Sequence, residues 1–121
     1  MTTRKLFLIS FISVIFTLKG FSQTISLDSV MNYVGKEVTV CAKVQSISVS
    51  KSEKKTTYIN FGKPYPNQTF TVVIFEESLK NFSYIPSEQL KDKNVCITGT
   101  IILYKDKPEI IVKSETDIKI N

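Results

Sequence analysis

The sequence predicts an all-β protein, a small barrel of five strands with a short helix before the first strand and a helical segment between the third and the fourth. Apolar residues recur at every second position in five segments, which is the period of a strand that buries one face. Glycine, proline and polar residues separate these segments and are typical of turns. Only residues 26–35 and 76–91 depart from the two-residue period and favour helical structure.

The N-terminal segment has the order of a signal peptide. Basic residues precede an apolar run at residues 6–18, and small residues follow at Gly20 and Ser22. We expect residues 1–22 to be cleaved, which leaves residues 23–121 as one domain, periplasmic or secreted. Because a spanning helix needs about 20 apolar residues, we expect no stable membrane insertion after cleavage. The alternative is an uncleaved N-terminal anchor.

Export would change the charge of the protein. Three basic residues leave with the signal peptide, so 13 basic residues remain against 11 acidic ones, a net charge of about +2. Net charge alone therefore does not indicate a polyanionic partner, and only local clusters of lysine can do so.

The short helix is expected at residues 26–35, ahead of the first strand. Gly35 can end it, since glycine adopts the left-handed conformation that follows many helices. The apolar residues of its buried face are Leu27, Val30, Met31 and Val34.

The first two predicted strands flank a polar loop. Residues 36–49 alternate, with a bulge before the last apolar positions, and residues 50–55 carry no apolar side chain and favour a mobile hairpin loop. The second strand covers residues 56–61, where alternation turns Tyr58 and Asn60 outward.

The third strand is expected at residues 69–75, after a loop at residues 62–67 that contains two prolines. Its alternation places Phe75 on the outer face. Residues 76–91 then cover the barrel with short helical turns, because Pro86 forbids one continuous helix. The apolar residues expected to cover the core are Leu79, Phe82, Ile85 and Leu90.

The last two strands are expected at residues 94–104 and 109–113, joined by a turn. Gly99 lies within the first of them and predicts a bulge or a bend. Three strands, a helical connection and two more strands are the order of a five-stranded oligonucleotide/oligosaccharide-binding (OB) barrel, whose closure removes exposed edges.

The two cysteines are expected to form a structural disulfide. An OB topology sets the first strand antiparallel to the fourth, and alternation sends both Cys41 and Cys96 to the outer face. Disulfides persist in oxidising compartments, which agrees with export. The alternative, a redox or metal site, lacks a C-x-x-C motif and any histidine.

Three segments resemble the strand motifs of nucleic-acid-binding OB domains: residues 34–44 (VGKEVTVCAKV), 57–62 (TYINFG) and 95–101 (VCITGTI). The chain is similar to the anticodon-binding domains of class II aminoacyl-tRNA synthetases and to OB domains of exported bacterial nucleases. Cys41 and Ala42 depart from the tRNA-binding pattern, which has a glycine followed by a large residue. The resemblance therefore implies fold more firmly than activity.

The ligand face of an OB barrel is the outer face of its second and third strands, framed by two loops. Lysines there can contact phosphates, and aromatic rings can stack on bases. Taken alone, each residue is better explained by solvation or packing, and their convergence on one predicted face is what favours nucleic-acid binding. The candidate residues are Lys51, Lys54, Lys55, Tyr58, Asn60, Lys63, Tyr65, Phe75, Lys105 and Lys107.

These features predict a binding protein without catalytic residues, metal or cofactor. The absence of histidine excludes Ser-His and Cys-His nucleophiles and histidine-ligated metal sites. We expect the ligand to be single-stranded nucleic acid or a similar anionic polymer, alone or with a partner protein. Two alternatives remain: a protein-, peptide- or glycan-binding envelope module, and a metal-dependent nuclease.

Overall fold

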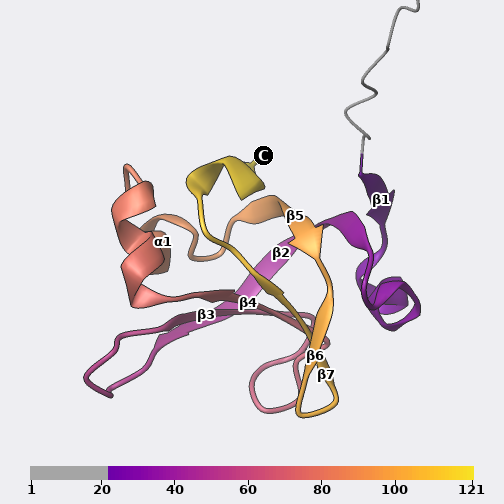
Figure 1. Cartoon of the computed structure of the whole chain (residues 1–121), viewed down its shortest axis with the longest axis horizontal. Helices are drawn as coiled ribbons and strands as arrows, with labels where there is room; N and C mark the ends of the chain where they lie inside the picture. The colour runs from indigo at the N-terminus through magenta and orange to yellow at the C-terminus, as the bar shows by residue number, and fades with distance from the viewer. Residues whose placement is uncertain (1–21) are drawn as a thin grey trace, which may run out of the picture.

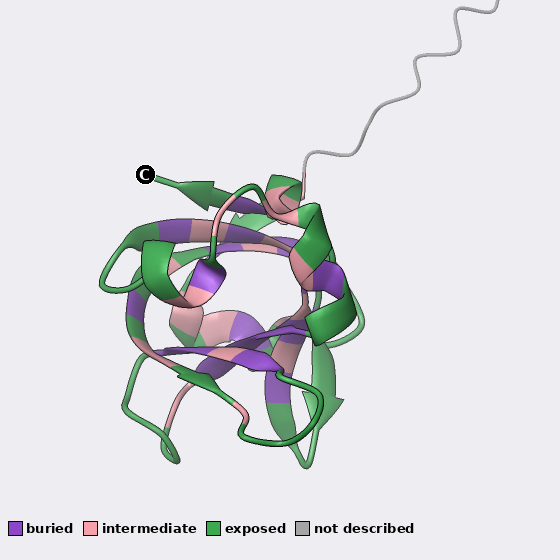
Figure 2. Ribbon diagram, turned by 90° about the vertical axis from the view of Figure 1, so that its left-hand side faces the viewer, coloured by how far each residue is buried: buried purple, intermediate pink, exposed green. Residues whose placement is uncertain are grey.

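The computed structural model describes residues 22–121, so the predicted signal peptide lies outside the described part except for Ser22. Within that part, strands in the order β6-β7-β4-β3-β2-β5-β8 form one curved sheet, and β1 pairs with β2 off this path (Figure 1). Buried residues are concentrated in the strands of the curved sheet, and exposed residues occupy its loops (Figure 2). The all-β OB-type fold is confirmed.

Strand β2 (Glu37–Val49) belongs to both halves of the sheet. One half contains β3, β4, β7 and β6, and the other contains β5, β8 and β1. Its first part pairs antiparallel with β5 and its second part pairs antiparallel with β3. The register shifts between Val44 and Ser46, where the sequence predicts a bulge. A bulge bends a strand and increases its twist, and this bend lets one strand serve both halves.

The predicted second, third and fifth strands are β3 (Thr57–Phe61), β4 (Phe70–Ile74) and β7 (Lys107–Ile111). Strand β3 pairs antiparallel with β4, and β4 pairs parallel with β7. All five residues of β4 are buried, which makes this strand the centre of the site-bearing half.

The predicted fourth strand, residues 94–104, is divided in two. Strand β5 (Asn94–Thr100) pairs with β2, and β6 (Ile102–Tyr104) pairs with β7. Ile101 lies between them and forms a bridge with Val34. The hydrogen-bonded sheet is not closed, because its end strands β6 and β8 do not pair; the covalent chain at Ile101 completes the ring. The prediction that strand pairing closes the barrel is therefore wrong, because the sheet is open between β6 and β8.

Gly99 does not form a bulge, and the predicted fourth strand divides at Ile101, not at Gly99. It pairs with Val38 in an unbroken register between β2 and β5. A Cβ atom at Gly99 would lie 2.5 Å from Cγ2 of Ile110. The glycine is therefore required because the Ile110 side chain packs directly against its backbone.

Two short strands escape the sequence pattern. Strand β1 (Gln23–Ile25) runs parallel to β2 and buries Ile25, and β8 (Ile118–Ile120) pairs antiparallel with β5 and buries Ile118. Three residues are too few to display an alternation, so the sequence pattern does not reveal these strands.

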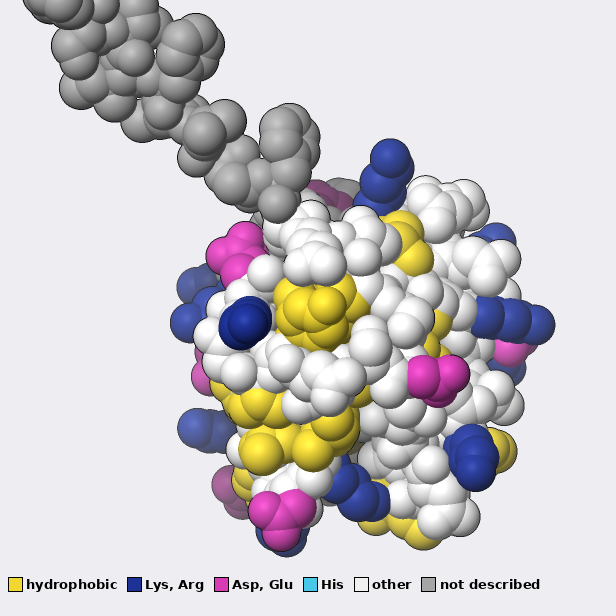
Figure 3. All heavy atoms as spheres, turned by 90° about the vertical axis from the view of Figure 1, so that its right-hand side faces the viewer, with side chains coloured by type: hydrophobic (Ala, Val, Ile, Leu, Met, Phe, Trp, Pro, Cys, Tyr) yellow, Lys and Arg dark blue, Asp and Glu magenta, His cyan; other side chains and the backbone are white. Residues whose placement is uncertain are grey.

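The expected N-terminal helix is the 3-10 helix η1 (Leu27–Tyr33). Such a helix has three residues per turn, so Leu27, Val30 and Tyr33 share the face that packs on the core. Met31 falls off this face and is 51% exposed, contrary to the prediction from a 3.6-residue period. Figure 3 shows hydrophobic side chains gathered on the side of the molecule that carries β1 and η1.

The segment between β4 and β5 is helical, as predicted. It contains the 3-10 helix η2 (Glu76–Asn81) and the α-helix α1 (Pro86–Gln89), which Pro86 begins. Leu90 is fully buried, but Ile85 is 58% exposed because it is the N-cap of α1 and does not belong to a buried face.

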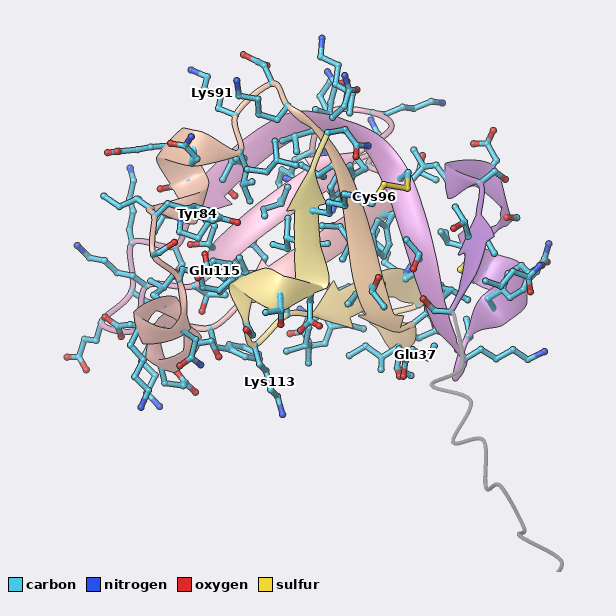
Figure 4. All side chains as sticks on the ribbon, turned by 90° about the horizontal axis from the view of Figure 1, so that it is seen from above. Glu37, Tyr84, Lys91, Cys96, Lys113 and Glu115 are labelled. Carbon is cyan, nitrogen blue, oxygen red and sulfur yellow. A yellow bond between two sulfur atoms is a disulfide. The ribbon has the colours of Figure 1, made fainter. Side chains whose placement is uncertain are left out.

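Hydrogen bonds tie this helical segment to the C-terminal part of the chain. The backbone N–H and the hydroxyl of Ser83 both donate to Oε2 of Glu115, at 3.3 and 2.8 Å, and Nδ2 of Asn81 donates to the carbonyl of Lys113. Burial, followed by the charge of Glu115, raises the pKa of Tyr84 (Figure 4). The helical segment and the 3-10 helix η3 (Glu115–Asp117) therefore close one end of the core together.

The predicted disulfide is present. Cys41 and Cys96 are register partners in β2 and β5 and are joined by a bond across a sequence separation of 55 (Figure 4). It crosses the strand pair that links the two halves of the sheet.

Candidate functional site

An open cleft of ≈ 410 Å³ lies on the outer face of β2, β3, β4 and β7. This is the face that the sequence predicts for the ligand. The lining residues are Ser48, Tyr58, Asn60, Tyr65, Gln68, Thr71, Tyr104, Lys105, Lys107 and Glu109.

One row of polar residues crosses four strands, and three of its four members lie at the floor of this cleft. The register pairs Ser46 with Asn60, Asn60 with Thr71, and Thr71 with Glu109. Residues at paired positions of neighbouring strands point to the same side of a sheet. Alternation in β3 turns Tyr58 to this side as well, two positions from Asn60.

A chain of hydrogen bonds begins at Gln68 and runs along this row to Ser46, with each residue donating to the next. Nε2 of Gln68 donates to Oγ1 of Thr71 at 3.3 Å, and Oγ1 of Thr71 donates to Oδ1 of Asn60 at 3.1 Å. Nδ2 of Asn60 donates to Oγ of Ser46 at 3.3 Å. Because Asn60 and Thr71 are buried, this chain forms a fixed polar floor.

One acceptor at the cleft wall has no partner. Oε1 of Gln68 is buried and accepts no hydrogen bond from the described residues. An unsatisfied buried acceptor costs about 1–3 kcal/mol, so a donor supplied by a ligand would relieve an existing cost.

The hairpin of β6 and β7 builds one wall of the cleft. Its two turn residues, Lys105 and Asp106, have φ values of 48° and 64°, and Tyr104 pairs with Lys107 across the turn. Positive φ at both central residues matches the twist of the flanking strands. Nζ of Lys107 donates to the carbonyl of Pro66 at 2.7 Å, which ties this wall to the loop between β3 and β4.

Three tyrosines surround the opening. Tyr58 is half-buried on β3, Tyr65 is exposed on the β3–β4 loop, and Tyr104 is exposed on β6. Nζ of Lys105 lies 5.5 Å from the centre of the Tyr104 ring, a cation–π contact. Three aromatic faces can therefore meet a planar group that enters the cleft.

The charges of the cleft have both signs. Lys105 and Lys107 are cationic, and Glu109 is acidic. Burial raises the pKa of Glu109, because its charged form has lost part of its hydration.

The structure brings five of the ten predicted residues together in the cleft: Tyr58, Asn60, Tyr65, Lys105 and Lys107. The other five lie outside its lining. Lys51, Lys54 and Lys55 are exposed in the β2–β3 loop, and Lys63 is exposed in the β3–β4 loop. Phe75 follows the last residue of β4 as the N-cap of η2. A role for these five in binding stays a prediction.

The β2–β3 loop has more local structure than the predicted mobile hairpin loop. The hydroxyls of Ser50 and Ser52 both donate to the carbonyl of Lys54, at 2.8 and 2.7 Å, and the N–H of Thr56 donates to Ser50. These bonds fold the loop into a turn that projects its lysines into solvent.

Five residues of the cleft lining were not predicted from the sequence: Ser48, Gln68, Thr71, Tyr104 and Glu109. The sequence pattern could have indicated Tyr104 and Glu109 as cleft residues, because the alternation of their strands turns both residues outward. Gln68 lies in a loop, where no such pattern indicates the direction of a side chain.

A second cleft of ≈ 340 Å³ adjoins the bulge of β2 and includes Ser46, Lys91 and Asp92. In residues 22–121 no group of three or more histidine, cysteine, aspartate or glutamate residues could hold a metal ion. Over the same range, every helix is too short or too polar to cross a bilayer.

Comparison with known proteins finds similar folds among solved structures. No family model and no curated protein matches the chain. The crystal structure of yeast Stn1 and Ten1 is similar with a TM-score of 0.58 at 10% identity, over 87% of this chain and 65% of that chain. A protein described as an aspartyl-tRNA synthetase from Leishmania major Friedlin is similar with a TM-score of 0.53 at 12% identity, over 86% of this chain and 21% of that chain.

The chain thus spans less than two thirds of the first structure and about a fifth of the second. At these identities the likeness shows the fold alone. The second structure is described as a member of the class of proteins to whose OB domains a similarity is expected from the sequence. The chain therefore has the OB fold, which confirms the expectation drawn from its strand order.

Proposed function

We propose that this protein is an exported, non-catalytic OB-fold protein that binds single-stranded nucleic acid in the cleft over β3 and β4. The observation that carries the proposal is the arrangement of Tyr58, Tyr65 and Tyr104 around an opening flanked by Lys105. Stacking on aromatic side chains is worth ~1–3 kcal/mol per base and tolerates any sequence. Lysine contacts with phosphates add affinity that falls as salt rises.

Further support comes from the chemistry of the chain. The sequence has no histidine, and Glu109 is the single carboxylate of the cleft, whereas acid–base catalysis commonly needs a pair of groups. The signal-peptide pattern of residues 1–22 and the disulfide favour export into an oxidising compartment. One similar structure is named as an aspartyl-tRNA synthetase, a protein that acts on a nucleic acid.

The test is a titration of a fluorescent single-stranded oligonucleotide with the purified protein. We expect binding that weakens between about 50 and 200 mM salt, because counterions are released from the phosphates. Tyr58→Ala and Tyr104→Ala should each weaken binding about tenfold through lost stacking. Lys105→Ala should reduce the salt dependence, whereas Lys80→Ala, an exposed lysine of η2, should not.

A glycan is the second candidate, because the floor of the cleft offers amides and hydroxyls from Asn60, Thr71 and Gln68. Such groups can hydrogen-bond to sugar hydroxyls, and tyrosine faces can pack on sugar rings. Binding of a neutral oligosaccharide that does not change with salt, without binding of the oligonucleotide, would select this candidate.

A further inference from the structure

We propose, on the basis of the proposed function, that Glu109 and Gln68 make the cleft selective among bases, favouring guanine and disfavouring thymine and uracil. Both residues line the same cleft as the stacking tyrosines. Both present hydrogen-bond acceptors, and this common property determines which base edge fits.

The hydrogen bonds of the floor set the orientation of Gln68. The hydroxyl proton of Thr71 is used on Asn60, so Oγ1 of Thr71 accepts from Nε2 of Gln68. The amide group of Gln68 therefore turns its nitrogen toward the floor. Its oxygen is left as a buried acceptor without a partner in the described part of the chain.

Glu109 lies at the end of the polar row, where the floor meets the β6–β7 hairpin. It pairs with Thr71 on one side and with Ile102 on the other. The charged groups that line the same cleft are Lys105 and Lys107, of which Lys107 is occupied by the Pro66 carbonyl. An ionised carboxylate only accepts hydrogen bonds, and its two oxygens can accept from two donors at once.

Guanine matches this arrangement. In a single strand its Watson–Crick edge is free and carries two adjacent donors, the ring N1–H and the N2 amino group. The two oxygens of Glu109 can accept from both, and a rotation of the Gln68 side chain that uncovers its buried amide oxygen would let it accept from the second amino hydrogen. Thymine and uracil present one N–H between two carbonyl oxygens, which would face acceptors and lose their hydration without compensation.

The experiment compares three oligonucleotides of about nine nucleotides, a length within the range of one OB domain. All are thymidine runs that differ at the central position, which is guanine, hypoxanthine or thymine. Hypoxanthine differs from guanine only by loss of the N2 amino group. We expect the guanine oligonucleotide to bind about tenfold more tightly than the all-thymine one, with hypoxanthine between them, as for other bidentate contacts to a base.

Two variants test whether Glu109 and Gln68 cause the preference for guanine. Glu109→Gln and Gln68→Met should each bring the guanine-to-thymine ratio of affinities below about threefold. Glu77→Gln, which removes the same charge from exposed η2, should keep the wild-type ratio. Circular dichroism of each variant confirms that it is folded.

The outcomes separate the two proposals. If the wild-type protein binds all three oligonucleotides equally, or if both Glu109→Gln and Gln68→Met keep the preference, the base-reading role is overturned and the proposed function stands. If none of the three oligonucleotides binds, the proposed function itself fails.

Discussion

Cys41 and Cys96 face each other across β2 and β5 as direct register partners, and the bond joins these two residues across a sequence separation of 55. These two strands connect the half of the sheet that carries the cleft to the half that carries β1 and β8. The bond therefore constrains the longest-range pairing on which the fold depends.

Replacing both cysteines, as Cys41→Ala with Cys96→Ala, should lower the free energy of unfolding by about 4 kcal/mol. The physical reason is the conformational entropy that the unfolded chain regains when a loop of this length is opened. Urea denaturation with and without reductant measures it. Reduced wild-type protein should show a similar loss, and a loss below about 1 kcal/mol in both samples would contradict the structural role.

Gly99→Ala should destabilise the protein by about 1–3 kcal/mol. The new methyl group would lie 2.5 Å from Cγ2 of Ile110, so β5 or β7 would have to shift within a packed core. Thermal unfolding followed by circular dichroism measures the effect. Thr100→Ala, an exposed position of the same strand, is the control and should change stability by less than about 0.5 kcal/mol.

Asn60→Ala should destabilise the protein by about 1–3 kcal/mol, although it removes only a small polar group. The change leaves the Thr71 hydroxyl and the Ser46 hydroxyl without their partner at the floor of the cleft. Ser48→Ala, at the exposed edge of the same cleft, serves as the matched control. Equal stability of the two variants would show that the floor network contributes nothing.

The stability of the wild-type protein relative to Glu109→Gln should fall as pH rises above 4.5. Burial raises the pKa of Glu109 from its usual value of 4.5, so the folded protein holds this proton more tightly than the unfolded chain does. The resulting stabilisation is complete at low pH and is lost as pH rises through the raised pKa.

Urea denaturation of both proteins at a series of pH values measures this difference. Asp117, whose pKa is raised by burial and then by Glu37, titrates in both proteins and cancels. A difference that grows in favour of the wild type with rising pH would have the wrong sign and would refute the assignment.

The sequence was sufficient for the order of the main strands because each of them buries one face and exposes the other. This is why Cys41 and Cys96 could be paired and why Tyr58 and Asn60 could be placed on the ligand face. Phe75 was placed there by the same alternation, but its strand ends one residue earlier. The pattern carries no information about where a strand stops.

The remaining parts depend on contacts between distant segments. Strand β1 forms by pairing with the distant strand β2, and Gln68 reaches the cleft because the β3–β4 loop folds over the outer face. Met31 was assigned to the buried face of a 3.6-residue helix, whereas the chain adopts the tighter 3-10 turn. The local sequence does not specify these outcomes, since packing against the rest of the sheet selects them.

The junction at Ile101 links the cleft to a remote part of the chain. Its carbonyl accepts from the N–H of Gly35 at 2.7 Å, and its own N–H donates to the carbonyl of Lys36 at 3.1 Å. These two bonds fix the point at which the chain leaves β5 and enters β6, the strand that bears Tyr104. Gly35 and Lys36 thereby help to position one wall of the cleft, although neither residue lines it.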